Sequence, residues 1–247
     1  MKLENYLKEI ENYLQKYLVK SKLQKYVLGV SGGIDSALVL ALAKNAVGEQ
    51  NVLAYILPIH SLEEDAKLAI ALCEKLNVAY QVIDLSHAYD ELIKSYNFDN
   101  NKFVEASLQN VKVRLRMVTL YAYAQVHQAL VLGTDNASER YVGYFTKHGD
   151  GAADIMPIFH LLKSEVYEAA KLLGLPDQII NKVPSAGLSP LQNDEDDFGF
   201  TYKELDDFLL KKKITKESKK KIQRLHRINL HKLRSVARPK KYQRDKK

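Results

Sequence analysis

The first apolar residues of the chain recur every three or four positions between Leu3 and Leu18, and most positions between them carry charged or polar side chains. This spacing places the apolar side chains on one face of a helix. It therefore predicts an amphipathic opening helix that packs against a core through Leu3, Tyr6, Leu7, Ile10, Tyr13, Leu14, Tyr17 and Leu18.

Short continuous apolar runs follow, and they alternate with helical patterns. The runs predict strands, and we expect both faces of each strand to be covered because polar residues do not interrupt the apolar ones. The order strand, helix, strand predicts an α/β fold, a doubly wound and mostly parallel Rossmann-like sheet with helices on both faces. The predicted strands are 26–30, 51–58, 78–85 and 129–134, and the helices between them are 36–47, 62–76 and 110–128.

The regular alternation ends near residue 135. Residues 135–158 are rich in glycine, alanine and polar side chains, which is typical of a long functional loop. Helical patterns then return in three places, and a glycine and a proline stop the first of them. These segments are 163–176, 201–210 and 216–233.

The composition fits a folded protein. A chain of 247 residues with 46% hydrophobic content can bury a full core, and no apolar run is long enough to span a membrane. The N-terminus lacks a targeting signal, and the single cysteine, Cys73, lies in a helical pattern where packing is the expected role. We therefore predict one cytoplasmic domain over 1–247, without internal repeats, that ends in a basic tail over about 235–247.

The formal net charge of +7 comes largely from the basic run that closes the chain. A solvated basic helix face and tail is the first interpretation, and attraction to phosphate is the second. No aromatic-studded RNA-recognition motif accompanies the run. We expect no nucleic-acid partner and no membrane partner.

The most informative stretch is "GVSGGIDS", which joins a predicted strand to a predicted helix. Backbone N–H groups and the helix dipole at such a junction can hold an anion, and Ser31 and Ser36 add hydroxyl donors. The residues that would form this phosphate cradle are Gly29, Val30, Ser31, Gly32, Gly33, Ile34, Asp35 and Ser36. The alternative is a tight turn with a capped helix.

Asp35 separates this loop from the mononucleotide-binding P-loop, in which a lysine follows the glycines. A carboxylate beside a polyphosphate is repulsive unless a divalent cation lies between them, so Asp35 predicts Mg²⁺. A loop that binds the pyrophosphate part of ATP through Mg²⁺ indicates that the α-phosphorus is attacked and that pyrophosphate is the leaving group.

"SGGIDS" resembles the loop of the ATP-pyrophosphatases, the PP-loop or adenine nucleotide α-hydrolase superfamily. Further blocks resemble the ammonia-dependent NAD synthetase family, and the similarity covers nearly the whole chain in order. These blocks are 110–117, 133–158, 161–176, 184–209 and "HK" at 231–232. The resemblance implies that deamido-NAD⁺, ATP and ammonia give NAD⁺, AMP and pyrophosphate through an NAD-adenylate, as the last step of NAD biosynthesis.

The resemblance also implies roles for residues outside the loop. ATP would contact Thr134, Lys163 and Ser185, and Glu139 would join Asp35 as a Mg²⁺ ligand. Asp150 would bind ammonium and accept a proton, so that the catalytic residues would be Asp35, Asp150 and Lys163. Deamido-NAD⁺ would contact Arg114, Lys147, Asp154, His231 and Lys232.

Three features of the sequence qualify this assignment. Arg116 lies two positions after Arg114 on the same predicted helix, so it points elsewhere and is predicted to be solvated. The family pattern continues as His-Lys-Arg, whereas this chain reads "HKLRSVARP". No residue of 58–66 is assigned a role, because that loop matches the family poorly.

Three other classes of protein share part of this pattern. A glutamine-dependent synthetase would carry an amidase domain with a catalytic cysteine, which this length does not accommodate. Free ammonia is therefore the expected nitrogen source, and supply by a separate glutaminase partner is the alternative. A tRNA-modifying ligase of the same superfamily would suit the basic tail but would carry thiolation cysteines or an RNA-binding domain. A regulatory nucleotide-binding module would not need Asp35 together with Glu139.

The resemblance further implies a homodimer, with helix 110–128 contributing to the contact.

Overall fold

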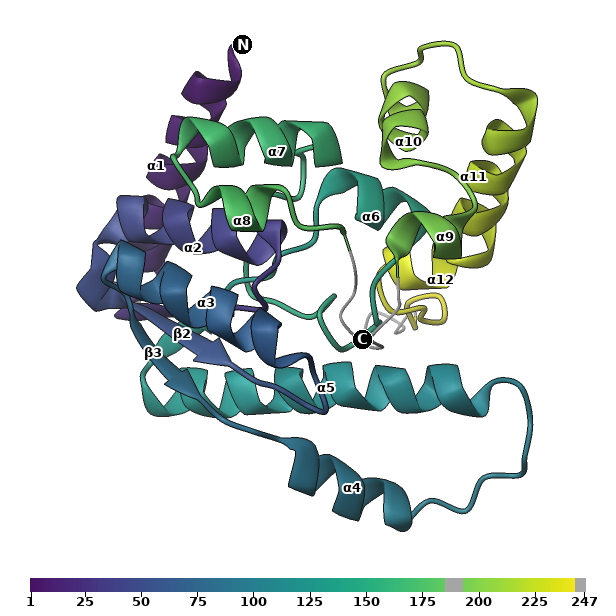
Figure 1. The fold of residues 1–247 in the computed structure, drawn as a ribbon, viewed down its shortest axis with the longest axis horizontal. Helices are drawn as coiled ribbons and strands as arrows, with labels where there is room; N and C mark the ends of the chain where they lie inside the picture. The colour runs from purple at the N-terminus through teal and green to yellow at the C-terminus, as the bar shows by residue number, and fades with distance from the viewer. Residues whose placement is uncertain (185–192, 243–247) are drawn as a thin grey trace, which may run out of the picture.

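The computed structural model describes residues 1–184 and 193–242 of the chain. Its centre is a sheet of four strands in the order β3-β2-β1-β4, in which every paired neighbour is parallel. Strands β2 and β3 of this sheet are labelled in Figure 1. Val27 at the centre of β1 pairs with Leu53 on one side and with Val131 on the other. The strands are β1 (Lys25–Gly29), β2 (Val52–Ile56), β3 (Ala79–Val82) and β4 (Ala129–Val131). The predicted doubly wound α/β fold is confirmed.

Helices pack on both faces of this sheet (Figure 1). On one face, Tyr26 and Leu28 of β1 pack in a core formed with four helices and the short α8. The Tyr26 hydroxyl also donates a hydrogen bond to the Leu14 carbonyl at 2.6 Å. On the other face, Val27 and Val131 pack against a single long helix, α5. The first group comprises α1 (Leu3–Ser21), α2 (Ile34–Val47), α3 (Glu63–Leu76), α7 (Lys163–Leu172) and α8 (Asp177–Ile180), and α5 spans Val104–Val126.

The helix that follows the "SGG" turn, α2, is apolar on all sides. Its residues from Ile34 to Ala43, apart from partly exposed Asp35, are buried between α1, α7 and the sheet. Burying a leucine or valine stabilises a fold by about 1.5–3 kcal/mol, so this helix is anchored firmly. The N-terminus of α2 is consequently fixed at the carboxyl end of β1, where the candidate phosphate loop begins.

The expectation that both faces of every strand are covered is wrong for β3. All four of its residues are exposed, and Tyr80 and Val82 are 39% and 44% accessible. The strand lies at the sheet edge and pairs only with β2, while the core beneath α5 involves β1, β2 and β4. Several boundaries also differ from prediction. The largest differences are that α5 begins at Val104 rather than at 110, and that β3 and β4 end at Val82 and Val131 rather than at 85 and 134.

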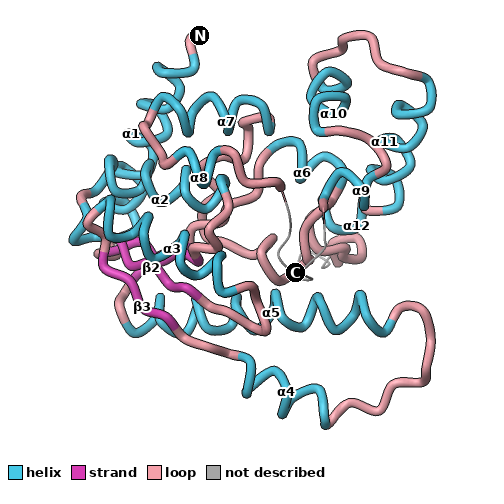
Figure 2. The backbone as a smooth tube through the Cα atoms, viewed as in Figure 1, coloured by secondary structure: helices cyan, strands magenta, loops and turns pink. Residues whose placement is uncertain are grey.

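The helices of the C-terminal part lie to one side of the sheet (Figure 2) and enclose a third apolar cluster. Phe198, Tyr202, Leu205 and Ile222 are buried there against Val142. The contributing helices are α6 (Ala137–Val142), α9 (Asp194–Phe198), α10 (Tyr202–Leu209) and α11 (Lys216–Ile228), followed by α12 (Leu230–Leu233). The remaining elements are α4 (Ser86–Lys94) and a short 3₁₀ helix, η1 (Glu49–Asn51).

Asn136 caps α6 by accepting a hydrogen bond from the Glu139 N–H, and a Thr201–Glu204 capping box starts α10. Both caps fix helices whose side chains reach the space between the sheet and the C-terminal cluster. Within the part of the chain that is described, no helix has both the length and the apolar character of a membrane span.

Candidate active site

A cavity of about 510 Å³ opens where β1, β2 and β4 end. Strand β4 lies on the opposite side of β1 from β2, so the strand order reverses there, and ligands bind at this position in open parallel sheets. Most of the predicted phosphate and catalytic residues line the cavity. They are Gly29, Val30, Ser31, Gly33, Ile34, Asp35, Ser36, Thr134, Glu139, Asp150 and Lys163. Ser185 falls outside the described residues.

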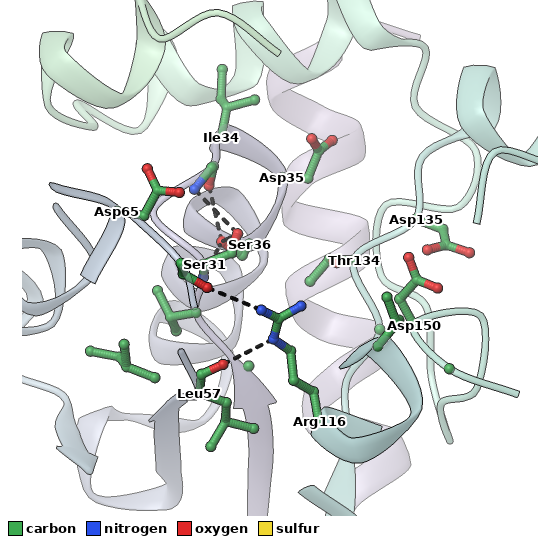
Figure 3. A pocket seen from close by; sticks show the side chains of 18 of the residues that line it. Ser31, Ile34, Asp35, Ser36, Leu57, Asp65, Arg116, Thr134, Asp135 and Asp150 are labelled. Atoms are coloured by element: carbon green, nitrogen blue, oxygen red, sulfur yellow. Dashed lines mark hydrogen bonds between the residues drawn. The ribbon is translucent and has the colours of Figure 1, made fainter. Parts of the chain in front are cut away.

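The "SGG" turn requires glycine at one of its two positions. Gly32 has a φ of +75°, and a Cβ there would lie 2.5 Å from the Asp65 carbonyl oxygen, so both conformation and space exclude a side chain. Gly33 has an ordinary φ of −91°. The Ser36 hydroxyl closes the turn, because it donates to the Gly33 carbonyl at 3.0 Å and accepts from the Ser31 N–H at 3.2 Å (Figure 3).

A lysine lies between two carboxylates beside this turn. The ammonium of Lys163 is 2.6 Å from Asp35 Oδ2 and 3.0 Å from Glu139 Oε1, and the Lys163 side chain is only 3% exposed. Asn136 donates to the other Asp35 oxygen at 2.8 Å, and the Tyr202 hydroxyl donates to Glu139 at 3.3 Å. We call Asp35, Glu139 and Lys163 the lysine cluster.

Burial and mutual charge set the protonation of this cluster. Burial, reinforced by the negative charge of Asp35, raises the pKa of Glu139 to about 7. Burial alone would lower the pKa of Lys163, but the two carboxylates raise it above its usual range. Lys163 is therefore a permanent cation in the cavity wall.

Two further carboxylates lie on another side of the cavity (Figure 3). Asp135 is 4% exposed and accepts from the Arg140 guanidinium at 3.3 Å, while Asp150 accepts the N–H groups of Thr146 at 2.7 Å and Gly151 at 3.0 Å. Burial raises the pKa of Asp135, and the charge of Asp150 raises it further. The pKa of Asp150, an exposed residue, is raised because its carboxylate is partly desolvated against the cavity wall. We call Asp135, Asp150 and Arg140 the aspartate cluster.

Four of the five predicted dinucleotide contacts meet outside the cavity lining. Arg114 donates to the Lys147 carbonyl at 3.2 Å, and the Lys147 ammonium donates to the His231 carbonyl at 3.0 Å. Lys232 donates to the carbonyls of Gly143 and Phe145. The Asp154 carboxylate instead accepts the Val131 N–H at 2.7 Å. Segments distant in the sequence thus bring four of these residues together, through bonds from side chains to backbone carbonyls.

The solvated placement predicted for Arg116 is wrong. Its guanidinium lines the cavity and donates to the Leu57 carbonyl at 2.9 Å and to the Ser61 hydroxyl at 3.2 Å. Sequence reasoning also missed Asp135, Asn136 and Tyr202. The first two follow directly after the "GT" that leaves β4, so their position at a strand end was an available signal. The position of Tyr202 depends on the packing of α10 and had no local signal.

Residues 6–247 match a family model described as NAD synthase. The chain is 46% identical over 215 residues to the NH(3)-dependent NAD(+) synthetase of Finegoldia magna, with 86% of this chain and 88% of the relative covered. The NMN synthetase structure from Francisella tularensis superposes with a TM-score of 0.91 at 38% identity, covering 97% of this chain and 99% of that one. An NH3-dependent NAD synthetase structure from Campylobacter jejuni gives a TM-score of 0.80 at 32% identity, covering 97% and 100%.

Proposed function

This chain belongs to the NAD synthase family, and from that premise we propose how its residues carry out the reaction. The activity is ATP-dependent amidation with ammonia in NAD biosynthesis, and the family match does not favour a tRNA-modifying ligase. The substrate is deamido-NAD⁺, whose nicotinate carboxylate is first adenylated and then amidated. The products are NAD⁺, AMP and pyrophosphate.

In the first step a nicotinate carboxylate oxygen forms a bond to the α-phosphorus of ATP, and the bond from that phosphorus to the pyrophosphate oxygen breaks. The turn at 31–36 and the N-terminus of α2 offer N–H and hydroxyl donors to the leaving pyrophosphate. Lys163, held protonated beside the turn, offsets the charge that develops on the phosphates. Thr134, at the end of β4, completes this wall.

The donor set of the lysine cluster fits Mg²⁺. Asp35 and Glu139 present carboxylate oxygens, which are hard ligands, and Mg²⁺ in nucleotide sites is held by one or two carboxylates together with substrate phosphates. No group of three or more metal-ligating side chains occurs among residues 1–184 and 193–242, which agrees with a site that the substrate must complete. Mg²⁺ bound to Asp35 and Glu139 would neutralise the pyrophosphate that leaves.

In the second step ammonia attacks the acyl carbon, a C–N bond forms, and the C–O bond to AMP breaks. Asp150 accepts the proton that the attacking amine loses, because its carboxylate faces the cavity and its raised pKa makes it a better base. Arg114, Lys147, Asp154, His231 and Lys232 bind the remainder of deamido-NAD⁺.

One observation carries this proposal: Asp35 of the phosphate turn and Glu139 after β4 contact the same buried ammonium at the switch point of the sheet. The test is incubation of the purified protein with ATP, Mg²⁺, deamido-NAD⁺ and NH₄⁺. We expect NAD⁺ and AMP in equal amounts. ADP as the product, or no NAD⁺, would refute the proposal. Replacing NH₄⁺ with glutamine should abolish product formation.

A second candidate differs in the acceptor only. The structure from Francisella tularensis, with a TM-score of 0.91, is named an NMN synthetase. The same adenylation and amidation steps applied to nicotinate mononucleotide would give NMN. The ratio of kcat/KM for deamido-NAD⁺ and nicotinate mononucleotide decides between the two, and we expect it to exceed one.

We also propose that the protein acts in the cytoplasm as a homodimer. Helix α5 supports the dimer, because only Val113 and Ala124 of its 23 residues are buried while Val118 and Val126 are 58% and 75% exposed. Light scattering of the purified chain should give twice the 28.1 kDa monomer mass. A Val118→Glu variant should shift that mass towards the monomer.

A further inference from the structure

Arg116 reaches from α5 into the cavity and is held there by the β2–α3 loop (Figure 3). Its Nε donates to the Leu57 carbonyl at 2.9 Å, and its Nη2 donates to the Ser61 hydroxyl at 3.2 Å. Two of the three guanidinium nitrogens are therefore fixed by hydrogen bonds. In Figure 3 the third nitrogen points away from Leu57 towards the Thr134 side of the cavity.

The charge of Arg116 is not balanced in the way that the other cations of the site are. Lys163, Arg140 and Lys182 each have a carboxylate oxygen within ion-pair distance. Among the residues the structure describes, Arg116 has none. Partial burial lowers its pKa, and the negative charges of Asp150 and Asp65 offset part of that effect. A guanidinium stays protonated at any physiological pH, so a partly desolvated positive charge lines the cavity.

A partly desolvated charge without an ion-pair partner is costly, and an anionic ligand would offset that cost. The surroundings identify the anion, because the guanidinium lines the same cavity as Ser31, Ser36 and Thr134, at the turn that presents N–H donors (Figure 3). Arginine also suits phosphate oxygens, since its planar group donates along fixed directions. The two hydrogen bonds to the β2–α3 loop hold the group in place before the nucleotide binds.

We propose that Arg116 binds the phosphate chain of ATP through its third guanidinium nitrogen. The inference rests on the proposed function, because it assumes that ATP occupies this cavity. It assigns to Arg116 a direct contact with the substrate, in addition to a role in holding residues 57–61.

The test compares how the full-length protein binds a non-hydrolysable ATP analogue, α,β-methylene-ATP, and adenosine, both by calorimetry with Mg²⁺ present. Four variants are needed: Arg116→Gln, Arg116→Lys, Ser61→Ala and, as a control, Arg224→Gln on the exposed face of α11. Ser61→Ala removes one hydrogen bond to the loop and keeps the charge. Adenosine lacks phosphates and reports whether the cavity is intact.

A charge-assisted hydrogen bond contributes enough that we expect Arg116→Gln to weaken binding of the analogue by about 10- to 100-fold. Its adenosine affinity should stay within about twofold of wild type, and Arg116→Lys should recover part of the loss. Ser61→Ala should cost less than about threefold, and Arg224→Gln should change nothing.

Three results would overturn the inference. The first is wild-type affinity of Arg116→Gln for the analogue. The second is an equal loss for analogue and adenosine, or a Ser61→Ala defect as large as that of Arg116→Gln, because either would mean that Arg116 only holds the loop. The third is a rise in the KM of Arg116→Gln for deamido-NAD⁺ with unchanged binding of the analogue. This result would mean that Arg116 contacts deamido-NAD⁺ rather than ATP. NAD⁺ formation by the wild-type protein tests the proposed function separately.

Discussion

The lysine cluster and the aspartate cluster have the same formal charges but different arrangements. In the lysine cluster one ammonium contacts both carboxylates, at 2.6 and 3.0 Å. In the aspartate cluster the cation, Arg140, forms its ion pair with Asp135, while Asp150 is held by two backbone N–H groups. One cluster is thus closed around its own cation, and the other leaves a carboxylate open to the cavity.

This difference divides the proposed reaction between the two clusters. A closed arrangement beside the phosphate turn keeps Asp35 and Glu139 in position for adenylation. An open carboxylate with a raised pKa can receive a small cation such as ammonium and then a proton. If the division is correct, substitutions in the two clusters should impair different half-reactions.

The largest effect is expected for Asp35→Asn. The change removes a proposed Mg²⁺ ligand and the shorter of the two contacts to Lys163. Losing stabilisation of charge at this position should lower kcat/KM by at least about 10²- to 10³-fold. Pyrophosphate release without ammonia measures adenylation alone, and it should fall as far as NAD⁺ formation does. Asp99→Asn, in an exposed segment, is the control. Normal adenylation in Asp35→Asn would remove Asp35 from the first step.

Lys163→Met tests whether the closed cluster depends on its cation. The substitution leaves two largely buried carboxylates without their ammonium, and breaking a buried ion pair in this way costs about 3–5 kcal/mol in the free energy of unfolding. Urea unfolding in EDTA should show the loss. Mg²⁺ should restore part of it, because a divalent ion bound to the folded state stabilises it by mass action.

The matched control for this variant is Lys171→Met, an exposed lysine on the same helix, α7. It should unfold like the wild type with and without Mg²⁺. Unchanged stability of Lys163→Met in EDTA would contradict the closed-cluster account, and so would a stability loss that Mg²⁺ leaves untouched.

Asp150→Asn should impair only the second half-reaction. Asparagine keeps the shape and the acceptor oxygen for the Thr146 N–H but cannot take a proton. Loss of a general base lowers the rate by about 10²-fold or more. NAD⁺ formation should drop by that factor while pyrophosphate release without ammonia stays near wild type. A parallel fall in both would place Asp150 in adenylation.

The two clusters also differ in how much of them the sequence revealed. The phosphate turn is contiguous, so "SGGIDS" between a strand and a helix was enough to predict its position and the requirement for glycine at Gly32. The parallel sheet followed from apolar runs that alternate with helical patterns. Side chains that approach from distant helices had no such local pattern, and Glu139, Asp150 and Lys163 were found by resemblance.

Arg116 and β3 show why periodicity alone was insufficient. A charged residue on an amphipathic helix is usually solvated, but α5 runs beneath the carboxyl ends of the strands, where a long side chain can reach the cavity. An apolar run reads the same in a central strand and in an edge strand, and only the strand order shows that β3 lies at the edge. Both errors concern tertiary position rather than local structure.

The smallest predicted effect concerns the buried member of the aspartate cluster and depends on pH. Burial, with the charge of Asp150, raises the pKa of Asp135 well above its ordinary 3.8. Between pH 3.8, where the unfolded side chain loses its proton, and the raised pKa of the folded protein, Asp135 is protonated only in the folded protein. The free energy of unfolding therefore falls as pH rises through this interval. Asn cannot titrate, so Asp135→Asn should gain stability relative to wild type as pH rises from about 4 towards 8.

Thermal unfolding at several pH values measures this, and each kcal/mol corresponds to about 2–4 °C for a chain of this length. The loss of the Arg140 contact adds an offset that is the same at every pH, so the slope of the difference in Tm is the quantity to compare. Asp99→Asn should run parallel to the wild type. A Tm difference for Asp135→Asn that stays flat with pH would mean that Asp135 is ionised in the folded protein, and that the aspartate cluster is balanced like the lysine cluster after all.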